Sequence, residues 1–203
     1  MKRTDYYSLM ERRIRRILMI SSSYDAYILE EDGQIEAQLY REYIDLNISN
    51  PPALTWVNTT QEAIDLLEKD PGYDLIIDMF NVRDAAIFDQ ARHIRERWPG
   101  IPIVILTNFS RELLKKIASA DQSAIDYIFT WNGNADLILA IVKLLEDRMN
   151  ADADILSSGV QAILLVEDSI RYYSTYLPAI YKLVLKHALT VMTRKDAMDG
   201  EMA

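Results

Sequence analysis

Two similar segments of the chain end in residues that differ in their capacity for metal chemistry. Residues 16–23 read Arg-Ile-Leu-Met-Ile-Ser-Ser-Ser, and residues 162–169 read Ala-Ile-Leu-Leu-Val-Glu-Asp-Ser. Both contain a short apolar run typical of a buried parallel strand. The carboxylates of Glu167 and Asp168 follow the second run and could hold a divalent cation. The hydroxyls of Ser21 and Ser22, which follow the first run, are poor ligands for such a cation.

Further residues with chemical potential follow other apolar runs of the chain. Asp78 and Met79 end the run that begins at Leu75, Thr107 ends another, and Thr130 with Trp131 ends a third. If these runs are parallel strands, their carboxyl ends meet at one edge of the sheet. We therefore expect a strand-end pocket there, with mostly neutral walls.

The alternation of apolar runs with helical patterns predicts the fold. Strands are predicted at 17–20, 54–57, 75–77, 103–106 and 125–129, and helices at 34–46, 59–69, 85–98, 110–120 and 134–149. Five such alternations predict a parallel sheet with helices on both faces, and right-handed crossovers leave few topologies. We predict a flavodoxin-like, doubly wound α/β fold with strand order 2-1-3-4-5.

The chain then restarts the same pattern near its end. Residues 161–166 repeat the first strand, and residues 170–189 repeat the following helix, interrupted by Pro178. A repeated unit accounts best for this restart. The predicted organisation has four parts: a basic helical lead-in at 1–15, a first domain at 16–149, a linker at 150–159, and the incomplete start of a second domain at 160–203.

Composition excludes several function classes. The formal net charge is −9, which argues against general nucleic-acid binding. The chain has no cysteine, so thiol catalysis and thiolate metal sites are excluded. No apolar stretch approaches the roughly 20 residues of a membrane span. The basic lead-in lacks the apolar core of a secretory signal, so we expect a cytoplasmic protein without membrane contact.

Residues 16–149 resemble a response-regulator receiver domain, and residues 160–195 resemble the opening third of another. Four pieces carry the resemblance in order and spacing, namely 16–22, Tyr73-Asp74-Leu75-Ile76-Ile77-Asp78, 102–107 and Ile125-Asp126-Tyr127-Ile128. The stretch from Ser21 to Tyr40 is longer than in most receivers. It resembles the receivers attached to phosphoenolpyruvate/pyruvate-binding, phosphotransferase-like proteins.

The resemblance implies that the first domain has lost its metal chemistry. A receiver binds Mg²⁺ with an acid pair after its first strand, and that pair falls on Ser21 and Ser22. A lysine normally ends the fifth strand, and its position falls on Thr130, followed by Trp131 in place of proline. Thr107 matches the usual hydroxyl. We expect a pseudo-receiver that binds protein partners, has no cofactor and no Mg-dependent phosphorylation, and is not an enzyme.

The phosphoacceptor position is ambiguous in the sequence. Counting from Asp74 with the spacing usual in receivers reaches Met79, and Asp78 lies one residue early. Because side chains alternate between the faces of a strand, a shift of one residue decides which face Asp78 occupies. Asp78 is the sole candidate acceptor. The alternative is a structural strand-end aspartate bonded to loop amides.

In the second segment the resemblance assigns Glu167 and Asp168 to a metal pair, so Mg²⁺ would bind only in a completed second domain. The partners implied are a sensor kinase or an effector domain of the same polypeptide. Residues Tyr172 to Tyr181 form an aromatic and apolar stripe, which if exposed favours a homodimer. A different class of function also fits: a flavodoxin-like domain that binds a small flat ligand between Phe80, Phe109 and Trp131.

Overall fold

Five short apolar segments pair into one parallel sheet. The protein is described from a computed structural model, which places residues 10–21, 35–48, 50–80, 86–107, 115, 117, 119–131, 133, 135–158 and 160–200. Side chains are described to Thr190, except those of Phe80 and Ser158. The strands are β1 (Arg16–Ile20), β2 (Ala53–Val57), β3 (Leu75–Phe80), β4 (Ile103–Thr107) and β5 (Tyr127–Thr130). Their order is β2-β1-β3-β4-β5, which confirms the predicted flavodoxin-like topology.

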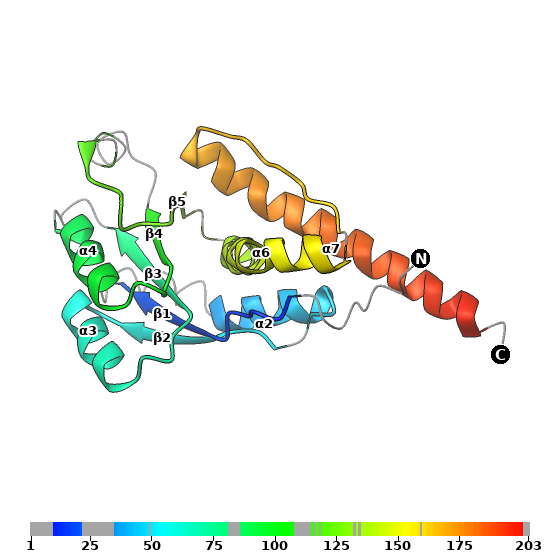
Figure 1. The fold of residues 1–203 in the computed structure, drawn as a ribbon, viewed down its shortest axis with the longest axis horizontal. Helices are drawn as coiled ribbons and strands as arrows, with labels where there is room; N and C mark the ends of the chain where they lie inside the picture. The colour runs from blue at the N-terminus through cyan, green and yellow to red at the C-terminus, as the bar shows by residue number, and fades with distance from the viewer. Residues whose placement is uncertain are drawn as a thin grey trace.

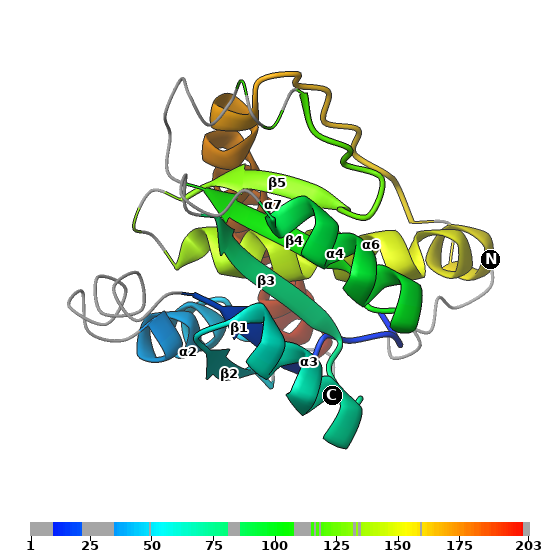
Figure 2. The same cartoon turned by 90° about the vertical axis from the view of Figure 1, so that its left-hand side faces the viewer.

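Helices cover both faces of this sheet (Figure 1). The bounds are α2 (Ile35–Asp45), α3 (Thr60–Lys69), α4 (Ile87–Arg97), α6 (Asp136–Ser158) and α7 (Ile170–Gly200). Apolar side chains of α2 and α6 pack with one face of the sheet in a large core cluster. Those of α3 and α4 pack with the other face in a second cluster. Figure 2 shows the sheet between these two layers.

Local signals in the sequence set the start of α3. Thr59 precedes the helix, and its hydroxyl accepts a hydrogen bond from the Glu62 backbone N–H at 3.2 Å. The Glu62 carboxylate in turn accepts a hydrogen bond from the Asn58 N–H at 2.8 Å. The first bond pairs a backbone donor that the first helical turn leaves free, and the second pairs the N–H of the residue before the N-cap. The helix therefore starts where the capping-box pattern predicted. The predicted helix at 110–120 lies mostly outside the described residues.

Helix α6 is longer than its sequence pattern predicted. The predicted linker at 150–159 is wrong as far as Ser158, because α6 continues to that residue. Asn150 and Asp154 hold this extra length in place. The Asn150 side chain exchanges two hydrogen bonds with the Arg12 backbone, at 2.8 and 2.9 Å. The Asp154 carboxylate accepts from the Met10 N–H at 3.3 Å.

The residues just before β1 form no helix over 10–15, so the helical lead-in is not found there; residues 1–9 lie outside the described chain. The Ile14 N–H donates to Glu146 of α6 at 3.0 Å. Glu146 also pairs with Lys143 at 2.7 Å, and both side chains are almost fully buried. A buried carboxylate needs such partners to offset its desolvation. Polar side chains of α6 thus satisfy the backbone of this segment, which a helix would have satisfied internally.

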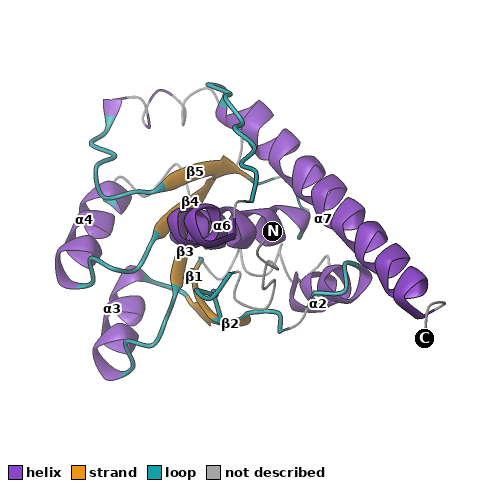
Figure 3. Ribbon diagram, turned by 45° about the vertical axis from the view of Figure 1, so that its right-hand side comes forward, coloured by secondary structure: helices purple, strands orange, loops and turns teal. Residues whose placement is uncertain are grey.

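The restarted pattern near the end of the chain gives a helix but no strand. Residues 161–166 form no strand, contrary to the prediction. Helix α7 packs instead against α6 and β5, with Leu177 buried in the large core cluster. Figure 3 shows α7 running beside α6, with its C-terminal part projecting past α2. Within the described residues, no helix is long and apolar enough to cross a membrane.

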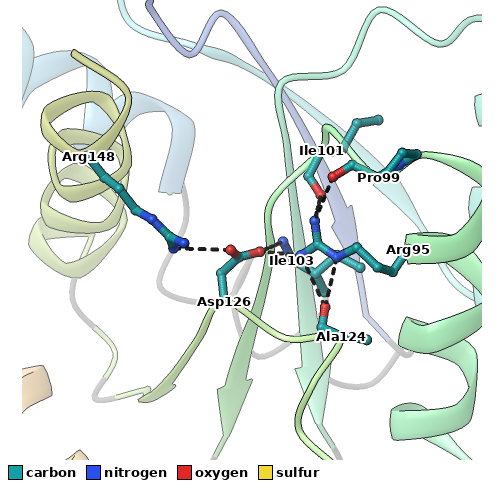
Figure 4. Close-up of polar contacts among 7 residues, drawn as sticks. All are labelled: Arg95, Pro99, Ile101, Ile103, Ala124, Asp126 and Arg148. Atoms are coloured by element: carbon teal, nitrogen blue, oxygen red, sulfur yellow. Dashed lines mark hydrogen bonds and ion pairs between the residues drawn. The ribbon is translucent and has the colours of Figure 1, made fainter. Parts of the chain in front are cut away.

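The amino edge of the sheet is held together by Asp126, which lies just before β5 (Figure 4). Its carboxylate accepts a hydrogen bond from the Ile103 N–H at 2.9 Å. It also pairs with Arg95 of α4 and, at 3.1 Å, with Arg148 of α6. The Arg95 guanidinium donates in addition to the Ala124 carbonyl at 3.1 and 3.2 Å. One carboxylate therefore ties together both helix layers and two strands.

We predict that Asp126→Asn lowers the free energy of unfolding by about 2 kcal/mol, because hydrogen bonds to charged groups contribute more than neutral ones. The measurement is urea denaturation followed by circular dichroism. The matched control is Asp89→Asn: Asp89 pairs with Arg92 on an exposed helix surface, at 3.1 Å, and its loss should change stability by less than about 0.5 kcal/mol. Equal effects of the two substitutions would contradict the role given to Asp126.

Candidate functional site

The residues predicted to line a strand-end pocket do lie at one edge of the sheet. Ser21 directly follows β1, and its backbone N–H donates to the Val57 carbonyl at 3.0 Å. Thr107 and Thr130 end β4 and β5 and are direct partners in the strand register. The Trp131 N–H donates to the Thr107 carbonyl at 2.8 Å, which continues the β4–β5 pairing by one residue. Ser22, Asn108 and Phe109 lie outside the described residues.

The register of β3 decides the face on which Asp78 lies. Asp78 pairs with Ile20 of β1 and Ile105 of β4, and Met79 pairs with Leu106. Paired residues in a parallel sheet share a face, and successive residues alternate. Asp78 therefore faces the α3 and α4 layer. Met79 faces the α2 and α6 layer. Ser21, which follows Ile20 and therefore lies beside Met79, is on the same face.

Met79 and Trp131 fill this edge of the sheet from one side. Both are partly buried and pack against the large core cluster, which also contains Leu106 and Phe129. Asp78 is 9% exposed and also has an interaction partner. The position that the receiver spacing assigns to the phosphoacceptor thus carries an apolar, core-packed side chain.

The site contains two unsatisfied hydroxyls. Ser21 is 2% exposed and Thr130 is 8% exposed. Neither Ser21 Oγ nor Thr130 Oγ1 has a hydrogen-bond partner within the described part of the chain. A buried hydroxyl without a partner costs about 1–3 kcal/mol. The sequence could not show that these two hydroxyls lack partners, because alternation along a strand indicates the face of a residue but not its hydrogen-bond partners.

Mg²⁺ would need oxygen ligands, usually with one or two carboxylates. Among the described residues of this edge, Ser21 and Met79 lie on one face of the sheet, whereas Asp78, Thr107 and Thr130 lie on the other. Each face thus offers at most one carboxylate, and the acid-pair position carries a hydroxyl, a poor ligand for a hard dication. Among the described residues, no group of three or more His, Cys, Asp or Glu side chains could hold a metal ion.

The acid pair of the second segment lies just before α7. The Glu167 carboxylate accepts a hydrogen bond from the Ser169 N–H at 2.9 Å. Ser169 begins the helix, because its carbonyl accepts from the Tyr173 N–H at 2.9 Å. Negative charge at a helix N-terminus is favourable. In this structure Glu167 and Asp168 therefore sit at a helix start and not at the end of a strand.

One contact at the site was not foreseen from the sequence. The Thr130 backbone N–H points outward from β5, the last strand of the sheet, and donates to Ser174 Oγ of α7 at 2.8 Å. The Ser174 hydroxyl donates in turn to the Ile170 carbonyl at 2.6 Å. Phe129 also stacks with Tyr173, with ring centroids 5.7 Å apart. Helix α7 therefore covers the β5 edge next to the candidate site.

The chain has the fold of response-regulator receiver domains. It is similar to a receiver domain protein from Methanospirillum hungatei, with a TM-score of 0.51 and 17% identity over 68% of this chain and 98% of that one. It is also similar to the signal receiver domain of an HD domain-containing protein from Pseudomonas fluorescens, with a TM-score of 0.50 and 20% identity over 70% and 94% of the two chains. The sequence matches no family model and no curated protein.

We predict that Ser21→Ala raises the free energy of unfolding by about 1 kcal/mol, because it removes a buried hydroxyl that has no partner. Ser174→Ala should lower it by about 1 kcal/mol, because the Thr130 N–H then loses its acceptor. Both values come from chemical denaturation under identical conditions. A loss of stability in Ser21→Ala would mean that the Ser21 hydroxyl does have a partner.

Proposed function

We propose that residues 16–149 form a pseudo-receiver, a protein-interaction or regulatory module of two-component signalling that works without Mg-dependent phosphorylation. The observation that carries the proposal is Met79. This residue occupies the acceptor position given by the receiver spacing and packs against the core cluster. A thioether cannot accept a phosphoryl group, and phosphoryl transfer depends on charged groups of which the described residues at this edge supply only Asp78.

The position of Asp78 supports the same proposal. Its register partners Ile20 and Ile105 lie on the face opposite to Met79. A phosphoryl group on Asp78 would therefore form on the α3 and α4 side, away from the face of the Ser21 position. We propose a structural role for Asp78, as part of the buried end of β3.

The neutral residues at the edge are consistent with one another. A receiver that keeps its acid pair and acceptor needs a lysine to balance their negative charge. Here Ser21 replaces one acid and Thr130 replaces the lysine, so less negative charge has to be balanced. The partners we propose are a sensor kinase or an effector domain of the same polypeptide, in the cytoplasm, and no catalytic role is included. In this proposal Glu167 and Asp168 bind Mg²⁺ only as part of a completed second domain.

The alternative, a small-molecule site between Phe80, Phe109 and Trp131, receives less support. Trp131 packs against the core cluster. The side chains of Phe80 and Phe109 lie outside the described set. The further resemblance to receivers of phosphotransferase-like proteins rests on the stretch from Ser21 to Tyr40, most of which also lies outside the described residues. It remains part of the proposal as a possible domain context.

We predict that Mg²⁺ with beryllofluoride, a phosphoryl mimic, does not bind this chain. Isothermal titration calorimetry and ¹⁹F NMR should detect no saturable binding up to millimolar Mg²⁺. A variant with Ser21→Asp and Met79→Asp restores two carboxylates on the neutral face and is the matched control, expected to gain Mg²⁺ binding.

Saturable binding of beryllofluoride by the unmodified chain would contradict the proposal. If that binding were lost in Asp78→Asn, the acceptor would be Asp78 and the domain would be a working receiver of unusual geometry. Circular dichroism of each variant establishes that it is folded before the titrations are compared.

A further inference from the structure

Helix α7 has two apolar faces, and only one of them is covered. The inner face carries Tyr173, Leu177, Tyr181 and Leu185, which contact or enter the large core cluster. The opposite face has large apolar side chains in solvent: Tyr172 is 52% exposed, Tyr176 46% and Leu183 71%. A helix that is apolar on both sides is usually covered on both. The outer face therefore requires a partner.

The inner face is fixed by specific polar contacts, so α7 cannot rotate to bury the outer face instead. The Tyr181 hydroxyl donates to Asp147 of α6 at 2.6 Å. Burial raises the pKa of the Tyr181 phenol, and the nearby Asp147 carboxylate raises it further, so the phenol remains a donor. Lys182 bridges Glu42 of α2 at 3.0 Å and Asp136 of α6 at 2.7 Å. These contacts leave the outer face turned away from the sheet.

Five of the exposed residues follow one line along the helix, which we name the outer stripe: Tyr172, Tyr176, Ala179, Leu183 and His187. Steps of three and four residues keep them on a single side. The spacing is also nearly symmetric about the bond between Ala179 and Ile180. In an antiparallel pair of such helices, Tyr176 of one would face Leu183 of the other, and Tyr172 would face His187.

The charges on α7 select the same arrangement. Between Ile170 and Thr190 the helix carries Arg171, Lys182 and Lys186 and no acidic residue. Two parallel copies would place Lys186 beside Lys186, and like charges in contact are destabilising. An antiparallel pair centred on Ala179 places Lys186 near the aromatic end of the other helix, where a cation can lie over a tyrosine ring. The small Ala179 at the centre allows the two backbones to approach closely.

We infer that the outer stripe is the interface of a symmetric homodimer, in which the α7 helices of two copies pack antiparallel. A two-fold interface uses the same surface of both copies, so that surface must be complementary to itself. The outer stripe meets this requirement. The stacked rings of Tyr172 and Tyr176, with centroids 5.9 Å apart, supply rigid aromatic anchors of the kind common in interfaces. The inference goes beyond the proposed function and does not depend on it.

The first test is the mass of the full chain in solution, by sedimentation velocity across a concentration series. We expect a dimer of twice the 23.4 kDa chain mass. Leu183→Glu should weaken dimerisation by roughly 100-fold, because a carboxylate would be buried against an aromatic ring. The matched control is Leu156→Glu at the end of α6, where the leucine is 85% exposed and off the outer stripe. It should leave the dimer unchanged. A monomeric unmodified chain at every concentration would overturn the inference.

A double substitution tests the predicted pairing. Tyr176→Lys alone should also weaken the dimer. Tyr176→Lys combined with Leu183→Glu should recover at least part of the loss, because each lysine then faces a glutamate of the other copy, twice per dimer. Two substitutions whose effects simply add would contradict the antiparallel register. Circular dichroism of each variant checks that loss of the dimer is not loss of the fold.

Cysteine cross-linking tests the direction of the helices, since the chain has no cysteine of its own. Ala179→Cys lies at the centre of the antiparallel pair and should form a covalent dimer under mild oxidation. Thr190→Cys lies on the same side of α7, but in the antiparallel pair the two copies of this residue are about 30 Å apart. It should remain uncross-linked. Cross-linking of both variants to the same extent would indicate parallel helices and overturn the inference.

Discussion

The rest of this structure depends on one constraint: backbone N–H and C=O groups at the borders of the sheet need hydrogen-bond partners. A parallel sheet pairs its inner strands fully but leaves outward backbone groups on its last strand, and buried groups of this kind are rarely left unpaired. At β5 the Thr130 N–H is satisfied by Ser174 of α7. Once α7 occupies that edge, the apolar segment at 161–166 has no strand there to pair with. The segment consequently remains irregular, with Leu164 87% exposed.

The same constraint acts at the other end of the chain. Residues 10–14 form no helix before the first strand, so their backbone groups need partners that a helix would have supplied internally. The partners are polar side chains on one side of α6, where Glu146, Asn150 and Asp154 follow one another at four-residue spacing. This explains why a buried, charged pair persists inside α6. Glu146 contributes to the fold mainly by accepting the Ile14 N–H, with Lys143 balancing its charge.

The character of the candidate site depends on one residue of β3, because Asp78 lies one position before Met79, where the receiver spacing places the phosphoacceptor. Strand alternation turns Met79 toward the core cluster and Asp78 toward the opposite helix layer. In the function we propose, the domain keeps the receiver fold and loses the charge distribution that makes phosphoryl transfer favourable. What the proposal leaves for signalling is the shape and surface of the domain. The most distinctive surface is α7, whose inner face covers β5 and whose outer face is apolar and basic.

The sequence alone determined the fold class, because the alternation of apolar runs and helical periods fixes a parallel sheet, and right-handed crossovers fix its strand order. It also identified Ser21, Thr107, Thr130 and Trp131 as neighbours at one edge, since parallel strands end together. It could not decide the face of Asp78, the length of α6 or the fate of residues 161–166. Periodicity describes which side of an element is apolar, whereas a strand exists only where another strand is free to pair with it. Tertiary packing decided these points, since α7 occupies the β5 edge and the side chains of Asn150 and Asp154 bind the backbone before β1.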